Sequence, residues 1–241
     1  MLEQVCKSYH CVDLTHSLHP DIPTWMGECG FKSEIHLDYS EGARVLNYHC
    51  IGSAGTHIDA PSHFIPQGKN IDAITLDALC TELCVIDMAA PSSPTAQISL
   101  KDIDTFEKKF GAIPSGSIVV GRTGWERHWA SPKIYRGTGE LPQSPSFEAA
   151  VGPLLLDREI AGLGIDTLSP DPFGSDYPLH HALLGNNLFI IENLAHLDAL
   201  PPKGSYIFAL PLKINQGTES PARVIAFVPN ATNNLPTKRE T

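Results

Sequence analysis

Ten consecutive residues, 55–64, concentrate the side chains of this chain that could do chemistry; they read Gly-Thr-His-Ile-Asp-Ala-Pro-Ser-His-Phe. His57 and Asp59 are two residues apart, so on an extended segment both side chains leave the same face. His63 follows a turn at Pro61, from which it can fold back toward that face. Neutral imidazole and carboxylate are donors for Zn²⁺, Mn²⁺ or Fe²⁺, and a further histidine can carry protons. The segment therefore predicts a metal site.

This segment resembles the signature of the cyclase-like metal-dependent hydrolases, a family that includes bacterial kynurenine formamidase (arylformamidase) and isatin hydrolase. The signature is His-x-Gly-Thr-His-x-Asp-x-Pro-x-His, and the chain matches it from Gly55 to His63. The resemblance covers residues 10–228, because further segments follow in the order of that family. These segments are Val-Asp13-Leu-Thr-His16, Ile-Pro23-Thr-Trp25, Arg122-Thr-Gly-Trp125, Gly164-Ile-Asp166-Thr, His180-His-Ala-Leu-Leu-Gly185, Ile-Glu192-Asn-Leu and Leu210-Pro-Leu.

The resemblance implies which side chains bind the metal. Besides His57 and Asp59 it assigns His180 and Glu192, whose twelve-residue separation matches the distal pair of the family. His181 is adjacent to His180, and on a helix the two side chains diverge by about 100°, so only one is expected to face the metal. The family register selects His180. We expect one or two divalent ions, with zinc the first candidate and manganese the second, and Asp59 is able to bridge two of them.

The implied reaction is hydrolysis of an amide bond, in an aryl formamide or a cyclic amide, by a metal-activated water. His63 is the candidate catalytic base and acid, because an imidazole with a free pKa near ~6.5 can accept and donate a proton near neutrality. Trp25 and Trp125 are candidate aromatic walls for a planar substrate, and the other role of such residues is to anchor a core. Gln216 is a candidate polar contact from a late loop.

One departure from the family pattern falls within the predicted metal site. The first metal-binding histidine of the family lies four residues before His57, and this chain has Ser53 there. A serine hydroxyl is a weak ligand for zinc, which binds thiolate, imidazole and carboxylate. We expect Ser53 to hydrogen-bond a water on the ion instead. The substitution leaves an alternative function open, a degenerate family member that binds metal or a small ligand without turnover, and a weaker one, a structural subunit without metal.

Composition argues against several other functions. Hydrophobic residues make up 42% of the 241 residues and charged residues 18%, which is typical of a globular domain. The formal charge of −10, without clustered Lys and Arg, argues against nucleic-acid binding. No apolar run approaches the about 20 residues that span a bilayer, and the N-terminal segment lacks the apolar region of a signal peptide. We therefore expect a cytoplasmic protein with a small-molecule amide substrate and six free cysteines.

Periodicity and turn residues predict the elements that position these side chains. Pro153 falls inside one predicted helix and is expected to kink or break it. At another, Ser99 and Asp102 form a variant capping box. Helices are expected at 100–110, within 147–158 and at 177–185, and strands at 11–18, 32–39, 44–53, 83–88, 117–121, 161–166, 188–192, 205–214 and 221–228.

These elements indicate an α/β fold, with a mixed β-sheet core and flanking helices. The family resemblance sharpens this to the swivelling β/β/α type, and it implies a homodimer or a homotetramer. The chain shows no internal repeat and no linker. We therefore expect a single domain over residues 1–228, followed by a polar tail at 229–241.

Overall fold

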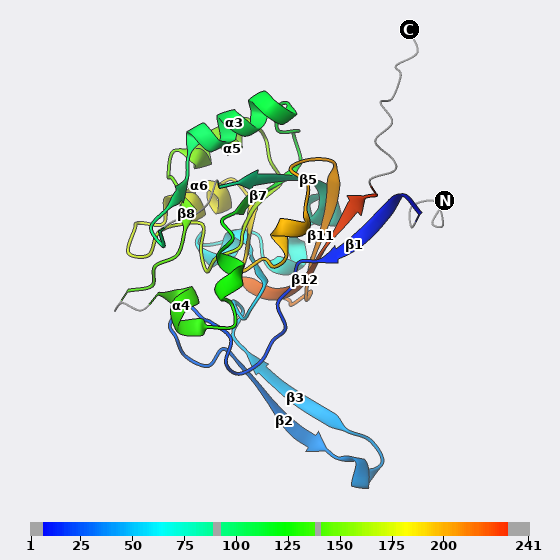
Figure 1. The fold of residues 1–241 in the computed structure, drawn as a ribbon. Coiled ribbons are helices and arrows are strands. Elements are labelled where there is room, and N and C mark those ends of the chain that lie inside the picture. Colours follow the sequence, from blue (N-terminus) through cyan, green and yellow to red (C-terminus); the bar gives the residue numbers. More distant parts are fainter. Residues whose placement is uncertain (1–6, 89–92, 138–140, 231–241) are drawn as a thin grey trace.

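The computed structural model describes residues 7–88, 93–137 and 141–230 (Figure 1). Its centre is an eight-stranded mixed sheet. Seven of these strands close into a barrel-like ring, because the first and the last of the seven also pair with each other. In spatial order the strands are β1 (Tyr9–Asp13), β12 (Glu219–Pro229), β11 (Ser205–Pro211), β5 (Cys80–Asp87), β7 (Ile118–Arg122), β9 (Gly162–Ile165), β10 (Phe189–Glu192) and β4 (His57–Asp59), with β12 pairing β4.

Helices cover one side of this ring. The parallel strands β5, β7, β9 and β10 are apolar on both faces, as expected for strands with side chains packed on each side. One face points into the ring, and the other packs against the helices on that side of the molecule (Figure 1). The helices are α2 (Leu76–Leu79), α3 (Leu100–Phe110), α4 (Pro132–Arg136), α5 (Val151–Asp157) and α6 (Pro178–Gly185), of which α3, α5 and α6 contribute to this outer core.

Two further strand pairs lie outside the ring. A short parallel pair joins β6 (Gln97–Ile98) to β8 (Ser146–Phe147). The antiparallel hairpin of β2 (Phe31–Leu37) and β3 (Val45–Cys50) projects away from the body of the molecule (Figure 1). We call this hairpin, residues 31–50, the arm.

The mixed α/β architecture confirms the predicted fold class. Helix α3 occupies the predicted residues, and the Ser99 N–H donates to the Asp102 carboxylate at 2.8 Å, as the capping box requires. Pro153 does not kink its helix. Helix α5 begins only at Val151, so this proline lies in the first turn, where a backbone N–H has no partner within the helix.

The end of the predicted domain needs a small correction. Strand β12 continues to Pro229, which pairs with Tyr9, and Asn230 donates from its side chain to the Lys7 carbonyl. The rest of the predicted tail lies outside the described residues, as does Cys6. The cysteines within the described part are free, as predicted. No helix in the described part is long and apolar enough to cross a membrane.

Candidate metal centre

Strand β4 places the two donors of the motif between two other strands. It pairs with β10 on one side and with β12 on the other. In this register His57 lies opposite Glu192, and Asp59 lies opposite Glu219. Ile58, between the two donors, points the other way into the core and is fully buried. Alternation along one short strand therefore lines up an imidazole and a carboxylate with an acidic residue from each neighbour.

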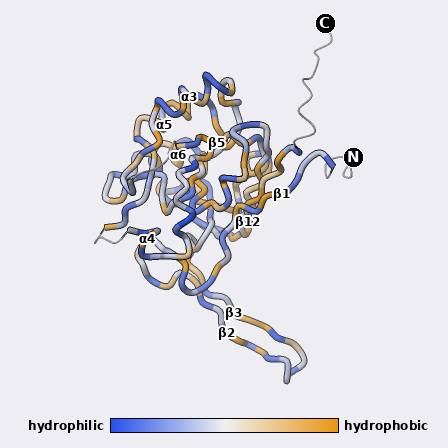
Figure 2. The backbone as a smooth tube through the Cα atoms, in the orientation of Figure 1, coloured by the Kyte–Doolittle hydropathy of each residue, from blue (hydrophilic) through white to orange (hydrophobic). Residues whose placement is uncertain are grey.

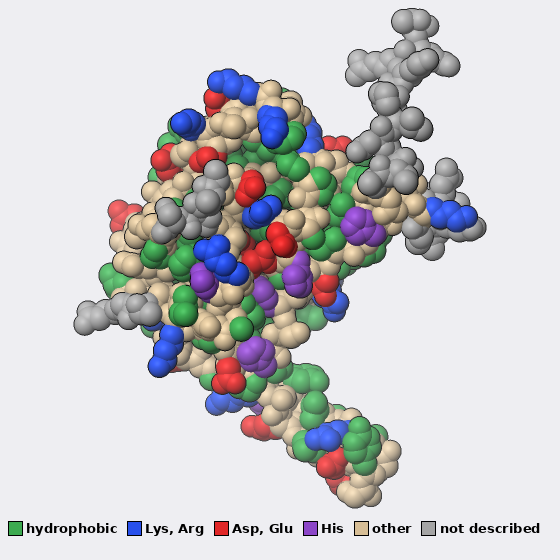
Figure 3. Space-filling model, in the orientation of Figure 1, with side chains coloured by type: hydrophobic (Ala, Val, Ile, Leu, Met, Phe, Trp, Pro, Cys, Tyr) green, Lys and Arg blue, Asp and Glu red, His purple; other side chains and the backbone are tan. Residues whose placement is uncertain are grey.

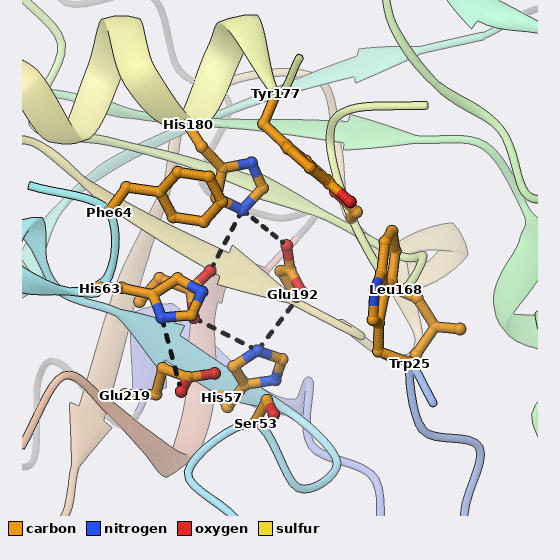
Figure 4. A pocket seen from close by; sticks show the side chains of 12 residues that line it. Trp25, Ser53, His57, His63, Phe64, Leu168, Tyr177, His180, Glu192 and Glu219 are labelled. Carbon is orange, nitrogen blue, oxygen red and sulfur yellow. Dashed lines mark ion pairs between the residues drawn. The ribbon is translucent and has the colours of Figure 1, made fainter. Parts of the chain in front are cut away.

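Helix α6 brings the fourth predicted ligand to the same point (Figure 4). The Nε2 atom of His57 lies 3.4 Å from Asp59 and 3.3 Å from Glu192. The Nε2 atom of His180 lies 3.5 Å from each of the same two carboxylates. The neighbouring His181 is exposed and does not line the cavity described below. The structure thus brings together all four residues that the sequence assigned to the metal.

A hydrogen bond at Nδ1 orients each of the two imidazoles. The Nδ1 atom of His57 is 2.8 Å from the Gly55 carbonyl, and Nδ1 of His180 is 2.8 Å from the Asp171 carboxylate. A carbonyl or a carboxylate only accepts a hydrogen bond, so each ring donates from Nδ1. The lone pair of each neutral ring then sits on Nε2 and points at the shared carboxylates. Histidine ligands of metal ions are held in this way, by a hydrogen bond to the second ring nitrogen.

The charges at this point call for a cation. Burial alone lowers the pKa of His57, but Asp59 and Glu192 outweigh it and raise that pKa well above its ordinary value. Burial likewise lowers the pKa of His180, and Asp171 leads the carboxylates that raise it well above the ordinary range. Burial raises the pKa of Asp59, yet the two imidazoles bring it below the usual range. Positive charge between these groups is strongly favoured, whether from protons or from a metal ion.

The donor set fits a divalent ion. The Oδ1 atom of Asp59 is buried and has no hydrogen-bond partner, a costly arrangement unless a cation accompanies it. Ligands about 2.1 Å from a tetrahedral ion lie about 3.4 Å from one another. Asp59 lies 3.4 Å from His57 and 3.5 Å from His180, and His180 lies 3.5 Å from Glu192. Side chains at this spacing leave room for an ion between them.

The structure also adds a donor that the sequence did not indicate. Two triads can each hold an ion, one of Asp59, His180 and Glu192 and the other of His57, Asp59 and Glu219. Burial raises the pKa of Glu219 and the Asp59 charge adds to this, while His63, His57 and a hydrogen bond from Ser53 act against it. Glu219 therefore supplies a carboxylate metal ligand beside the position where Ser53 replaces the family histidine.

A cavity of about 320 Å³ opens onto these donors. The predicted residues Ser53, His63 and Trp25 line it, and His63, 29% exposed at its side chain, has its Nδ1 atom 3.5 Å from the Glu219 carboxylate (Figure 4). The rest of the cavity lining is largely apolar. It includes Trp25, Phe64, Leu168 and Tyr177.

The structure corrects two predicted substrate contacts. Trp125 does not line the cavity: it is 7% exposed, packs with Tyr135 and Leu168, and donates its indole N–H to the Tyr135 carbonyl at 2.8 Å. Trp125 therefore anchors a hydrophobic core, which was the other role considered for it from the sequence. Gln216 is exposed in the turn before β12, and the residue from this segment that reaches the cavity is Glu219.

Several residues of the site escaped sequence reasoning, among them Phe64 and Leu168 of the cavity lining. Glu219 could have been found only from the pairing of β12 with β4, which no local pattern encodes. Asp171 sits in a Pro-Asp-Pro loop that resembles an ordinary turn. Tyr177 was placed on the predicted helix, with no sign that it faces the site; it lies just before α6, with a left-handed φ of 49°. That backbone conformation is uncommon for a residue other than glycine.

Similarity to known proteins agrees with this geometry. The Cyclase family model matches residues 12–172 of the chain. The chain belongs to this family. It is 32% identical to isatin hydrolase of Roseibium aggregatum, over 91% of this chain and 92% of that one. It is 26% identical to kynurenine formamidase of Bacillus cereus, over 91% and 98%. The fold superposes on isatin hydrolase A of Labrenzia aggregata, bound to benzyl benzoate, with a TM-score of 0.86 at 31% identity, covering 95% of this chain and 99% of that one.

Proposed function

We propose that this chain is a metal-dependent amidohydrolase that acts on an aryl formamide or a cyclic aryl amide. The observation that carries the proposal is that two Nε2 atoms meet two buried carboxylates at the floor of an apolar-walled cavity. One oxygen of these carboxylates, Oδ1 of Asp59, accepts no hydrogen bond. The family membership supports the hydrolytic chemistry. The similar isatin hydrolase and kynurenine formamidase support the two substrate classes.

The two triads define the ion sites of the proposal. Asp59 belongs to both and would bridge two ions, with His180 and Glu192 on one side and His57 and Glu219 on the other. Zinc is the first candidate, because each triad mixes imidazole with carboxylate. Manganese is the second, because carboxylate-rich sites suit it. A bound ion supplies Lewis acidity, which activates water and polarises a carbonyl.

The remaining chemistry belongs to the residues of this chain. His63 faces the donors from the rim of the cavity, with Nδ1 turned toward Glu219. Its part is to take a proton from the attacking water and to return one to the leaving nitrogen. Trp25, Phe64 and Tyr177 are placed to hold an aryl ring. Ring packing of Trp25 on Phe173, with centroids 4.7 Å apart, fixes the indole in this wall.

Metal analysis and an activity panel test the proposal. Protein purified without chelator is assayed for bound metal and for hydrolysis of isatin, N-formylkynurenine and simple formanilides, with added Zn²⁺ or Mn²⁺. We expect Asp59→Asn to lower metal content and rate together. We expect His63→Ala to keep the metal and lose at least ~100-fold in kcat, the usual contribution of an acid–base group.

The matched control for these variants is His181→Ala, which removes an exposed imidazole next to a proposed ligand. It is expected to keep both metal and rate. Hydrolysis of no panel member by metal-loaded protein would contradict the proposal. An unchanged rate in His63→Ala would remove His63 from its role.

No observation favours the degenerate alternative. That alternative was based on Ser53, which is a weak metal ligand. Glu219 places a carboxylate ligand next to this residue. The candidate acid–base residue His63 also lines the same cavity as the donors.

A further inference from the structure

Asn193 directly follows the proposed metal ligand Glu192, but it does not line the cavity. It is fully buried, and its backbone is left-handed, with a φ of 56°. Asparagine tolerates this conformation better than most residues other than glycine. The chain therefore turns as it leaves β10, and the Asn193 side chain reaches the segment that precedes β4.

The Asn193 amide bridges two segments that are far apart in the sequence. Its Nδ2 atom donates to the Gly55 carbonyl at 2.9 Å, and its Oδ1 atom accepts from the Tyr135 hydroxyl at 3.0 Å. The same hydroxyl also lies 2.9 Å from the Asp166 carbonyl. Because a carbonyl only accepts, the NH₂ group of Asn193 must face Gly55. Burial, together with nearby carboxylates, raises the pKa of Tyr135 well above its ordinary value, so the phenol keeps the proton that it donates.

The Gly55 carbonyl is also the acceptor that orients His57. One of its two lone pairs accepts from Nδ1 of His57 at 2.8 Å, and the other accepts from Asn193. Gly55 is left-handed, with a φ of 65°, and a Cβ atom at this position would lie 2.5 Å from the Leu18 side chain. The turn therefore requires glycine, the residue whose backbone is least restricted, and the carbonyl depends on its partners for a fixed direction.

Thr56 links the same two segments a second time. Its hydroxyl donates to the Asn193 carbonyl at 2.6 Å and accepts from the His16 N–H at 3.0 Å. The N–H of Asn193 donates to the Thr167 carbonyl at 2.9 Å. Asn193 is therefore held through its backbone, so its amide is presented to the Gly55 carbonyl in one position.

Water does not reach these hydrogen bonds. Asn193 and Tyr135 are fully buried, and Thr56 is 1% exposed. Hydrophobic stretches of the chain, orange in Figure 2, run through the interior around them. Charged side chains are instead spread over the surface (Figure 3), where water replaces a lost hydrogen bond. In the interior, a carbonyl or an N–H that loses its partner stays unpaired at a cost in free energy.

We propose that Asn193 is a positioning residue for the metal ligand His57. By donating to the Gly55 carbonyl, it fixes the acceptor that holds the Nδ1 proton of His57. Nε2 of His57 is then kept toward Asp59 and Glu192. Because Asn193 follows Glu192 and binds the turn before β4, it also holds the two ligand-bearing strands in register. The inference rests on the place of His57 in the proposed function, but the hold on the imidazole exists without a metal.

The two proposed histidine ligands have separate supports. A carboxylate, that of Asp171, accepts from Nδ1 of His180, whereas a backbone carbonyl accepts from Nδ1 of His57. The two imidazoles also belong to different triads of donors. Loss of the Asn193 amide is therefore expected to disturb His57 and to leave His180 as an internal reference.

Asn193→Gly tests the proposal, because glycine keeps the left-handed backbone and removes both hydrogen bonds of the amide. The Nδ1 protons of both imidazoles are followed by NMR of ¹⁵N-labelled, metal-free protein. In the variant, the proton of His57 is expected to exchange with water up to about 10-fold faster, the stabilisation that one hydrogen bond provides. The proton of His180 should be unchanged. An unaltered His57, or an equal change in both histidines, would overturn the proposal.

Two control variants separate this effect from a general loss of stability. Asn187→Gly makes the same substitution at another left-handed asparagine, which has a φ of 62° and is exposed. Ser117→Ala removes a buried hydrogen bond, 2.7 Å to the Pro114 carbonyl, at the opposite end of the parallel strands from Glu192. Both should leave the His57 proton unchanged. A His57 proton that changes as much in either control as in Asn193→Gly would contradict a specific role for Asn193.

A second variant and a metal measurement complete the test. Tyr135→Phe removes only the donor to Oδ1 of Asn193 and is expected to change the His57 proton in the same direction by less, which decides the question if Asn193→Gly does not fold. By chelator competition, Asn193→Gly should raise the Zn²⁺ dissociation constant about 10–100-fold, with both controls at the wild-type value. Unchanged Zn²⁺ affinity would overturn the role toward the ion. If wild type binds no metal, the proposed function fails, and the imidazole spectra still decide whether Asn193 holds His57.

Discussion

Replacement of Asp171 by asparagine probes the orientation of a proposed metal ligand without touching the ion site. One oxygen of this buried carboxylate accepts from Nδ1 of His180 at 2.8 Å and from the His180 N–H at 3.0 Å. The other accepts from the Leu179 N–H at 3.0 Å. Asparagine keeps the shape and one acceptor, but its NH₂ group must face one of these donors. Asp171→Asn therefore weakens the hold on the imidazole and its tautomer.

The expected effect is a loss of metal affinity with little loss of fold. Removal of a partner behind a metal-bound histidine typically costs 10–100-fold in affinity, or about 1.4–2.7 kcal/mol. Asp171 also satisfies two N–H groups in the first turn of α6. Asparagine still accepts from one side of this group of donors and leaves one N–H without an acceptor, so the free energy of unfolding of the metal-free protein should fall by no more than about 1–3 kcal/mol.

Chelator competition with Zn²⁺, repeated with Mn²⁺, measures the dissociation constant, and urea unfolding of metal-free protein measures stability. Asp176→Asn is the control, because this exposed aspartate lies in the same loop and loses the same charge. Wild-type affinity in Asp171→Asn, or an equal loss in Asp176→Asn, would refute the reasoning. The first result would mean that the Nδ1 contact does not orient His180 for an ion. The second would mean that only net charge matters.

Three further predictions concern stability. Removal of the metal with a chelator should lower the melting temperature, measured by calorimetry, by about 5–11 °C. The reference is protein in free metal at about 100 times its dissociation constant, where binding contributes about 2.7 kcal/mol. An unchanged melting temperature would argue against a metal in the folded state. Burial, followed by the Asp166 charge, raises the pKa of Glu126 to about 7. The folded protein therefore holds this proton more tightly than the unfolded chain does. The stability that results is full below pH 4.5 and is lost as the pH rises through about 7. Glu126→Gln should therefore gain about 1–2 kcal/mol over wild type at pH 8, after allowance for partial exposure, and nothing at pH 4.5, by urea unfolding at both values; a gain that is equal at both would contradict this. Gly121→Ala places a Cβ atom 2.4 Å from the Phe147 ring and should lower the free energy of unfolding by about 1–3 kcal/mol in the same assay. Gly185→Ala is the control, because its Cβ atom meets nothing nearer than 3.8 Å. Equal losses of stability in the two variants would argue against a packing cause.

Local sequence determined those parts of the protein in which neighbours along the chain decide the outcome. The two-residue spacing of His57 and Asp59 fixes a common face as soon as that segment is extended, and the structure extends it as β4. Helix α3 follows from its apolar spacing and from its capping box, and it begins and ends where predicted. The choice of His180 over His181 follows from family register, and the geometry of α6 buries the first and exposes the second.

Tertiary structure decided what depends on residues far apart in the chain. Glu219 reaches the site because β12 pairs with β4 on the side away from β10, and a glutamate at the start of a strand gives no sign of which strand it will meet. Trp25 and Trp125 look alike in sequence, yet only packing sends the first to the cavity wall and the second into a core with Tyr135. The cause is physical: alternation and capping act over a few residues, whereas strand order and burial are set by the free energy of the whole packed chain.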